Sequence, residues 1–368
     1  MAERKITFGT NLKALRKKAG LTRAALAEKI SYSEKSIEKW EASNSMPPVN
    51  TLCLLADILK VSVDNLLYSK SSKINYLLGI DGGGTKTEFL LCDINGNEKK
   101  RIILSCSNPV DIGMEKTKDI LNDGIRQITD GIDISEISMF AGLAGGISGD
   151  NQKRLEKFFG GFGFGSYSNA SDTASALECA LCGKNGIAVI MGTGIIAFAQ
   201  KDGERKRIGG WGYLIDKGGS GYNFGADALD CAFKYLDSRG GSKLIAELLQ
   251  KELGRDLPSC VPAIHAGGKK LIASFAKVVF EAYEKNDEYA KEIIENNVTE
   301  VAKIIKSGLE FTGNNVPAII CGGLANKQEI LKPFFNKYLG NDIEINFYTE
   351  PMVNGAVALA KKEIKNNA

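Results

Sequence analysis

A glycine-rich segment that follows a short apolar run holds the residues best suited to chemistry in this chain. The run Tyr76–Ile80 predicts a buried strand, and it leads directly into Asp81, Gly82, Gly83, Gly84, Thr85, Lys86 and Thr87. Glycines let a backbone approach a phosphate closely, and their free N–H groups form an anion-binding concavity. The threonine hydroxyls can donate hydrogen bonds, and the Asp81 carboxylate can hold a hydrated Mg2+ ion. The segment therefore predicts a site for nucleotide phosphates.

Two later segments repeat the pattern of a strand followed by glycines. The apolar run Ile187–Met191 leads into Gly192, Thr193 and Gly194. Alone, this triplet fits any hairpin turn, but its pairing with the first segment predicts a second phosphate loop and a duplicated architecture. A third turn, at Gly322 and Gly323, could let the backbone approach an adenine or a ribose, or could simply join a strand to a helix.

The elements that must position these turns alternate between strand and helix patterns from residue 74 onward. Predicted strands are Tyr76–Ile80, Glu88–Cys92, Lys100–Ser105, Ile137–Ala141, Ile187–Met191 and Ala318–Ile320. Predicted helices are Met114–Thr129, Gln152–Phe159, Asp172–Ala180 and, in two or more pieces, Leu271–Thr312. This alternation predicts an α/β body with mixed sheets.

The first seventy residues read instead as a series of short helices. The pattern predicts helices over Asn11–Lys18, Arg23–Ile30, Glu34–Glu41, Val49–Leu59 and Val63–Leu67. Two short helices joined by a tight turn, the second polar on its outer face, form a helix-turn-helix. A helical protein-interaction module is the alternative interpretation.

Composition and charge narrow the class of protein. A chain of 368 residues has room for two or three domains, and 43% apolar with 25% charged residues is ordinary for a globular protein. No apolar run approaches the roughly 18 residues of a membrane span, and the N-terminus lacks a signal-peptide core, so we expect a cytoplasmic protein without a membrane partner. The single histidine, His265, and the scattered cysteines argue against a zinc site.

Charge is distributed unevenly along the chain. Residues 1–70 hold 12 Lys and Arg against 7 Asp and Glu, and the remaining residues hold 35 against 37. A basic head on a mildly acidic body suggests that the head meets a polyanion.

The head resembles the Cro/cI-repressor-like (XRE) family of DNA-binding domains over about sixty residues. The resemblance rests on Leu21-Thr22, Leu26-Ala27, Ser33, Ile37, Trp40-Glu41, Pro47 and Leu54–Ala56. It implies that Ser33, Lys35, Ser36 and Lys39 face the major groove of double-stranded DNA and that Arg23 lies near a phosphate. Because operators are typically read by dimers, it also implies a homodimer.

The body resembles the BadF/BadG/BcrA/BcrD ATPase family and its N-acetylglucosamine kinase branch, within the actin/hexokinase/Hsp70 superfamily. Besides the glycine-rich turns, the resemblance rests on Ser107–Pro109, Gly142–Gly145, Ser171-Asp172, Gly209–Gly212, Gly219–Tyr222, Pro351 and Gly355-Ala356. It implies a head over 1–70 and two ribonuclease-H-like lobes over 71–185 and 186–368. A last helix near 352–365 would pack back on the first lobe.

The same resemblance implies roles for individual residues. The 81–87 and 192–194 turns would hold the phosphates of ATP, with Asp81 on Mg2+, and Gly322 and Gly323 would border the adenosine. Asp172 would accept the proton of a sugar hydroxyl, although from sequence alone it could be a helix N-cap. The amino sugar would contact Asn108, Gly145, Gly210, Trp211 and Gly212, while Trp211 could also be a core residue.

One departure from the family pattern affects the sugar site. Where the family carries Asp-Glu before Gly-Ser, this chain has Lys217-Gly218. A cation in place of an anion predicts an acidic amino sugar, such as N-acetylmuramic acid, or a sugar phosphate. Alternatively, Lys217 points to solvent and Asp216 takes the lost position. The departure also leaves open a sensing repressor whose body binds sugar or sugar phosphate without turnover.

Overall fold

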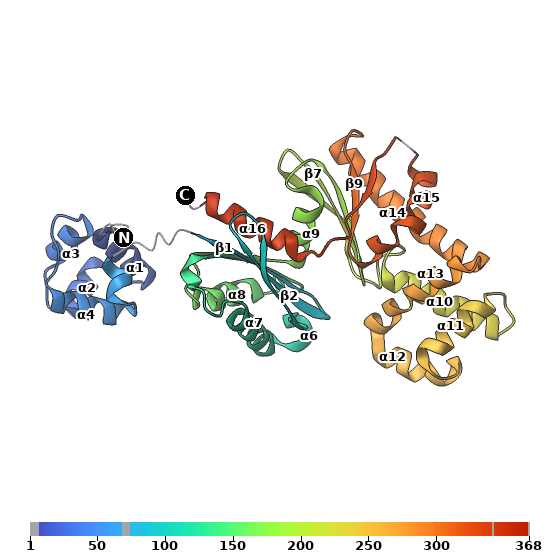
Figure 1. The fold of residues 1–368 in the computed structure, drawn as a ribbon, viewed down its shortest axis with the longest axis horizontal. Helices are drawn as coiled ribbons and strands as arrows, with labels where there is room; N and C mark the ends of the chain where they lie inside the picture. Colours follow the sequence, from blue (N-terminus) through green and yellow to red (C-terminus); the bar gives the residue numbers. More distant parts are fainter. Residues whose placement is uncertain (1–6, 68–73, 341, 367–368) are drawn as a thin grey trace. The chain divides into compact units, whose positions relative to one another are not determined.

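The computed structural model describes residues 7–67, 74–340 and 342–366, and its contacts divide the chain into a small helical head and a large α/β body that begins at Asn75. Each unit has its own hydrophobic core. Head and body are therefore described separately (Figure 1).

The head contains five short helices around one core. They are α1 (Phe8–Lys18), α2 (Arg23–Lys29), α3 (Glu34–Glu41), α4 (Val49–Leu59) and α5 (Val63–Leu67). Thr22 and Ser33 cap α2 and α3, each accepting a hydrogen bond from a backbone N–H three residues later. Leu26, Ile37 and Trp40 bury the inner faces of α2 and α3. The predicted helix-turn-helix is confirmed, with helix bounds within a few residues of those expected.

The first lobe of the body is a mixed sheet in the order β3-β2-β1-β4-β5. Its strands are β1 (Tyr76–Gly82), β2 (Lys86–Asp93), β3 (Glu98–Ser105), β4 (Ile137–Leu143) and β5 (Ser166–Ala170). β1 to β3 form an antiparallel meander, and β4 and β5 run parallel to β1. Its helical segments are α6 (Pro109–Ile112), α7 (Met114–Ile128), the 3-10 turn Ile134–Glu136, α8 (Asn151–Gly160) and α9 (Asp172–Leu181).

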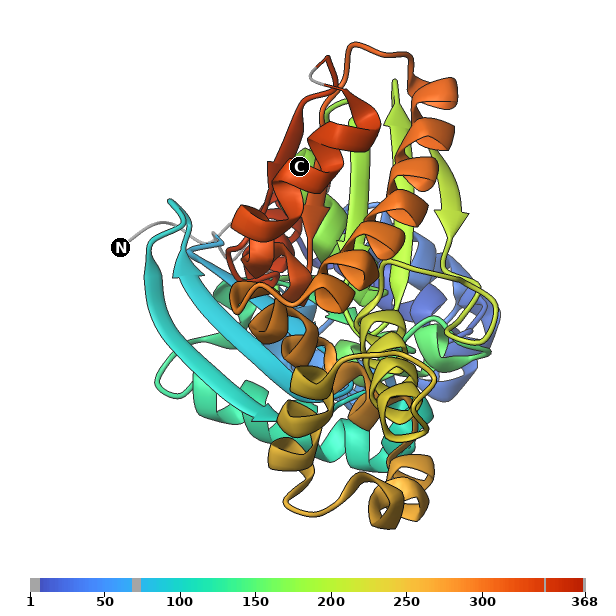
Figure 2. The same cartoon turned by 90° about the vertical axis from the view of Figure 1, so that its right-hand side faces the viewer.

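The second lobe repeats this topology in the order β10-β9-β6-β7-β8. Its strands are β6 (Gly186–Met191), β7 (Ile195–Lys201), β8 (Glu204–Gly209), β9 (Ala318–Cys321) and β10 (Ile345–Phe347). Its helices are α10 (Gly221–Leu236), α11 (Lys243–Leu253), α12 (Leu257–Ser274), α13 (Ala276–Glu284), α14 (Glu288–Thr312) and α15 (Gln328–Leu339), with a 3-10 turn at Gly323–Lys327. Figure 2 shows the orange α14 beside the yellow-green strands of this sheet, with which it shares a core. The repeat confirms the predicted duplication.

The C-terminal helix α16 (Val353–Asn366) lies on the sheet of the first lobe (Figure 1). The Ser138 hydroxyl donates to the carbonyl of Ala360 at 2.7 Å. Gly79 of β1 lies so close to the helix that an added Cβ would meet the Val357 nitrogen at 2.7 Å. The chain therefore crosses from the second lobe back to the first.

Several elements escaped prediction, and their composition explains why. β5 is Ser-Tyr-Ser-Asn-Ala, and β8 begins with four charged residues at the edge of its sheet, so neither shows a buried-strand pattern. α10, α11 and α15 were also missed. His265 is exposed on α12, and no group of three or more metal-binding side chains occurs within the described ranges. In those same ranges, no helix has both the length and the apolar character that crossing a membrane requires.

Candidate active site and nucleic-acid interface

The two glycine-rich turns open into one cavity of about 440 Å³ between the lobes of the body. Each turn ends the central strand of its own sheet, which explains why segments more than a hundred residues apart converge there. Of the predicted residues, the cavity is lined by Gly84, Thr85, Asn108, Asp172, Gly192, Thr193, Gly194, Gly210 and Gly212. Much of the predicted site is thus brought together.

The first turn is the tip of the β1–β2 hairpin, closed by a hydrogen bond from Gly83 N to Lys86 O at 2.9 Å. Two of its predicted side chains form hydrogen bonds within the lobe. Lys86 Nζ donates to Glu88 Oε2 at 2.9 Å, and the Thr87 hydroxyl donates to the Ser105 carbonyl at 2.7 Å. Thr87 is fully buried, so its predicted contact with phosphate is corrected, whereas Lys86 is exposed and its contact with phosphate stays a prediction. Thr85 remains exposed at the tip.

The second turn joins β6 to β7 and is closed by Gly192 N donating to Gly194 O at 2.9 Å. The start of α10 is fastened to it, because Gly221 N donates to Gly192 O at 2.8 Å and Tyr222 N to Thr193 O at 3.2 Å. Ser220 caps α10 through a reciprocal capping box with Asn223. This turn is therefore held by the helix that follows the predicted sugar loop.

Two half-buried carboxylates, Asp81 and Asp172, lie close enough for their charges to interact, and Asp172 lines the cavity. Burial, together with the charges of Asp172 and Glu88, raises the pKa of Asp81 to about 7, against a smaller opposing effect of Lys86. Burial also raises the pKa of Asp172. Two such acids, whose charges Lys86 compensates only in part, fit a divalent ion, and Mg2+ typically takes one or two carboxylates plus phosphate oxygens. The donor set therefore fits Mg2+ held by Asp81.

Asp172 begins α9, but Ser171 occupies the N-cap position. The Asp172 carboxylate accepts a hydrogen bond from Thr173 N at 3.0 Å, which acts to lower its pKa against the larger effect of burial. The Asp172 side chain therefore accepts a hydrogen bond from the first turn of α9 and also lines the cavity. The N-cap alternative for Asp172 is therefore wrong by one residue, whereas its place in the cavity lining is consistent with the predicted role as a base, which stays a prediction.

The sugar side of the cavity differs from prediction at one aromatic residue. Trp211 is 64% exposed and neither lines the cavity nor joins the core, and the Arg207 guanidinium lies 4.6 Å from its ring centroid. The neighbouring Tyr213 lines the cavity instead. Gly145 lies against Asn108, since an added Cβ would meet Asn108 Oδ1 at 2.3 Å. Both the Trp211 prediction and its core alternative are corrected.

Lys217 is exposed and does not line the cavity, whereas Asp216 does. Asp216 Oδ2 accepts a hydrogen bond from Gly212 N at 2.9 Å, which draws its carboxylate toward the loop interior. The predicted contact between Lys217 and a sugar is therefore corrected, and the alternative in which Asp216 takes the inward position describes the structure.

A second cavity of about 420 Å³ adjoins the second turn and is bordered by Gly323, Leu324 and the end of α12. Gly322 does not line it; an added Cβ there would lie 2.7 Å from Met191 O, so this glycine serves close packing. Three residues line both cavities, namely Gly192, Thr193 and Lys270. Lys270 was missed by sequence reasoning, although Gly267-Gly268 before Lys269-Lys270 was an available signal.

In the head, the residues of α3 that were predicted to contact DNA differ in how free their side chains are. Lys35 and Lys39 are exposed one turn apart on α3. The hydroxyls of Ser33 and Ser36 lie 2.9 Å from each other, and Ser33 also caps the helix. The two lysines are therefore the exposed cations that α3 offers to a polyanion.

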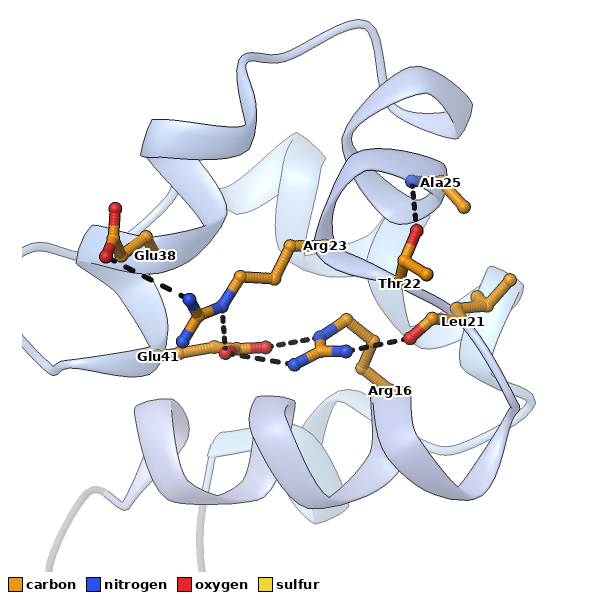
Figure 3. Close-up of polar contacts among 7 residues, drawn as sticks. All are labelled: Arg16, Leu21, Thr22, Arg23, Ala25, Glu38 and Glu41. Carbon is orange, nitrogen blue, oxygen red and sulfur yellow. Dashed lines mark hydrogen bonds and ion pairs between the residues drawn. The ribbon is translucent and has the colours of Figure 1, made fainter.

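Arg23, predicted to lie near a DNA phosphate, joins an ion-pair cluster with Glu41 and Arg16 (Figure 3). Its Nε donates to Glu41 Oε2 at 2.8 Å, while Arg16 Nε donates to Glu41 Oε1 at 2.5 Å. Burial acts to raise the pKa of Glu41, but the hydrogen bonds from both arginines outweigh it and lower that pKa. Arg23 thus holds α2 against α3, and because its side chain is 34% exposed, its contact with a DNA phosphate stays a prediction.

Comparison with known proteins gives matches to both units. Residues 78–359 match the model of the BadF/BadG/BcrA/BcrD ATPase family, and residues 7–67 match a helix-turn-helix domain. An N-acetylmuramic acid/N-acetylglucosamine kinase of Clostridium acetobutylicum is 29% identical over 309 residues, covering 79% of this chain and 99% of the relative. An N-acetyl-D-glucosamine kinase of Dictyostelium discoideum is 29% identical over 283 residues, covering 71% of this chain and 88% of the relative.

Solved structures share the fold of the body. A candidate N-acetylglucosamine kinase of Chromobacterium violaceum superposes with a TM-score of 0.63 at 24% identity, covering 78% of this chain and 99% of that one. At this identity the likeness establishes the fold alone. The predicted pair of ribonuclease-H-like lobes is confirmed.

Proposed function

This chain belongs to the BadF/BadG/BcrA/BcrD ATPase family, and we propose that it is an ATP-dependent amino-sugar kinase carrying a DNA-binding head. The observation that carries the kinase proposal is Asp172, a half-buried carboxylate in the cavity that both glycine-rich turns enter. Both of the curated relatives named above are kinases of N-acetylated amino sugars. The proposed substrate class is therefore N-acetylglucosamine or N-acetylmuramic acid.

The residues divide the work of phosphoryl transfer between two sides of the cavity. ATP, held by the backbone of the two turns and by Mg2+ on Asp81, would supply the phosphoryl group. Asp172 would hold the sugar hydroxyl in line and accept its proton, and the burial that raises its pKa makes it a stronger base. Transfer of this kind depends mainly on positioning and charge neutralisation, which a closed cavity lined by glycine turns favours.

The test is ADP release by the full chain with ATP, Mg2+ and a panel of neutral amino sugars, N-acetylmuramic acid and their 6-phosphates. We expect turnover with a free sugar, reduced at least about 100-fold in Asp172→Asn. Asp287→Asn is the matched control, because Asp287 also starts a helix and accepts a backbone N–H, from Ala290 at 2.9 Å, outside the cavity. Turnover unaffected by Asp172→Asn would refute the assignment.

A different result on the same panel would favour the second candidate, a sensing repressor. Thermal stabilisation by a sugar or sugar phosphate without any turnover would indicate that the body binds its ligand but does not phosphorylate it. The replacement of the family's Asp-Glu by Lys217-Gly218 is the observation that keeps this candidate in view.

For the head, we propose binding of double-stranded DNA through α3, by a homodimer that regulates transcription. Exposed Lys35 and Lys39 on the second helix of a helix-turn-helix support this. The affinity of the full chain for duplex DNA should fall steeply with salt, and replacing both lysines by alanine should lower the log–log slope by about 2 for each protomer, and so by about 4 for the dimer. Lys13→Ala, an exposed lysine on α1, is the control. Salt-independent binding would indicate a protein-interaction module instead.

A further inference from the structure

Resting on the proposed function, we infer that Lys270 is a phosphate-binding residue that grips the nucleotide where its phosphate chain passes from one cavity to the other. The two cavities share three lining residues, and two of them, Gly192 and Thr193, belong to a turn already assigned to phosphate. The third is Lys270, the only one of the three that carries a charge.

The ammonium group of Lys270 reaches across the cleft from the second lobe to the first. Its Nζ donates to the Gly84 carbonyl at 2.8 Å and to Asp111 Oδ2 at 2.9 Å. Gly84 belongs to the first phosphate turn, and Asp111 lines the same cavity. An ammonium carries three donors, and Gly84 and Asp111 take two of them. The group can therefore donate a further hydrogen bond to a phosphate oxygen, beside Asp111 or in its place.

The fold delivers this lysine through a break in α12. Gly268 adopts φ 55° and ψ −152° inside the helix, so the segment after it starts a new direction with Lys269 and Lys270. The end of that segment packs tightly on α10, because a Cβ on Gly225 would lie 1.8 Å from Ile272 O. The start of α10 is bonded to the Gly192 turn. Lys270 is therefore mounted on the same rigid support as the second phosphate turn.

The charges around the site explain why such a residue is needed. Lys86, the lysine inside the first turn, is paired with Glu88 and does not line the cavity. The lining residues include the carboxylates of Asp111, Asp172 and Asp216, and their cations are Lys269 and Lys270. A triphosphate entering this acidic surface gains a compensating charge from Lys270 in addition to Mg2+.

A simpler role for Lys270 is that of a latch that ties the lobes together through Asp111. The two roles predict different patterns. If Lys270 acts only as a latch, Lys270→Ala and Asp111→Asn break the same ion pair and should have the same effect. If Lys270 binds phosphate, Lys270→Ala removes a ligand of the nucleotide, whereas Asp111→Asn frees the ammonium from a competing acceptor.

The experiment measures binding of Mg·ATP and of adenosine to the full chain by calorimetry. We expect Lys270→Ala to weaken Mg·ATP binding about 10- to 100-fold, as loss of a charge-assisted hydrogen bond does, while adenosine binding changes by less than about twofold. Asp111→Asn should leave Mg·ATP binding unchanged or tighter, and Lys270→Arg should restore most of the loss. Lys277→Ala is the matched control, because the Lys277 side chain on α13 pairs with Glu252 on α11 and lines neither cavity.

Equal weakening in Lys270→Ala and Asp111→Asn, or equal loss of adenosine and Mg·ATP binding, would overturn the inference in favour of the latch. Wild-type binding of Mg·ATP without phosphorylation of any sugar would remove the kinase proposal, yet the variant pattern would still decide the role of Lys270. Absence of wild-type Mg·ATP binding would overturn both.

Discussion

The two lobes of the body share one strand order and direction but carry different turns at the same place. In the first lobe, the strands pair as far as Gly82 with Thr87, and Asp81 faces Glu88 across the hairpin. In the second, pairing ends at Met191 with Ile195, around a shorter turn with no ionisable side chain. The duplication thus supplies two backbone surfaces for phosphate, and only the first carries a carboxylate suited to a metal ion.

The lobes also differ in the segment that joins their third and fourth strands. In the first lobe this segment spans residues 106–136, and in the second it spans 210–317 and contains α10 to α14. The longer segment provides the Gly210–Asp216 side of the cavity and Lys270, while the shorter one provides Asn108 and Asp111. The repeated sheets therefore fix where the phosphates lie, and the unequal crossovers determine what else binds there.

The largest expected effect is on turnover, and it should distinguish the metal-binding first turn from the second turn. Asp81→Asn should lower turnover at least about 100-fold, because it removes the metal-holding carboxylate. Thr193→Ala in the opposite turn removes one neutral hydroxyl and should cost about 10-fold or less. Steady-state kinetics at varied Mg2+ measures both.

Comparable losses in the two variants would break the assignment of the metal to the first lobe. Thr85→Ala controls for loss of a hydroxyl within the first turn, since Thr85 is exposed at its tip and lines the cavity. We expect it to resemble Thr193→Ala and not Asp81→Asn.

The next effect is on how the stability of the body depends on pH. Asp81 in the first turn titrates, whereas the second turn has no titrating side chain. Burial and Asp172 raise the pKa of Asp81 to about 7 in the folded protein, so the folded state binds this proton more tightly than the unfolded chain does. The contribution of Asp81 to the free energy of unfolding therefore falls as pH rises from about 4 to about 7, by about 4 kcal/mol.

Urea unfolding of the full chain at several pH values tests this without any activity assay. Asp81→Asn should flatten the decline relative to wild type, and Mg2+ with ATP should reduce the decline in wild type by compensating the charge. Asp93→Asn serves as a control of opposite sign, because hydrogen bonds from Asn97 hold the pKa of Asp93 well below its usual range. A wild-type decline that persists unchanged in Asp81→Asn would remove Asp81 as its source.

Sequence reasoning located the elements whose pattern is set by burial. β1, β4, β6 and β9 are continuous apolar runs in the centres of the sheets, and all four were predicted. β5 and β8 are held by hydrogen bonds to a neighbouring strand, which no local apolar pattern reports. The head was predicted almost completely, because its helix starts carry capping residues such as Thr22 and Ser33.

The parts of the site formed by backbone could be predicted from the sequence. The partners of its charged side chains were harder to predict. The glycine turns could be read from the sequence, since glycine is required for close approach. Lys86 pairs with Glu88 two residues along the same strand, whereas Lys270 meets Asp111, 159 residues away, only because the fold brings them together. The ion pair between Arg23 and Glu41 was missed because the two residues lie on different helices.

The smallest expected effect compares the glycines themselves. A Cβ on Gly82 would lie 2.3 Å from Leu143 Cδ2 and 2.4 Å from Ser107 Oγ, both fully buried, whereas a Cβ on Gly192 would meet nothing nearer than Gly194 O at 4.0 Å. Gly82→Ala should therefore destabilise the body by about 1–3 kcal/mol through overpacking. Gly192→Ala should change its stability by less than about 0.5 kcal/mol.

Urea unfolding of both variants measures this difference, and Gly83→Ala provides the control inside the first turn, since its Cβ would lie at an ordinary 3.5 Å from Lys86 O. Gly82 belongs to the packing between β1 and the end of β4, while Gly192 has room for a side chain on the cavity side. Equal destabilisation by Gly82→Ala and Gly192→Ala would show that the second turn is as tightly enclosed as the first. In that case the two turns would differ in charge alone, and the contrast between the lobes would rest entirely on Asp81.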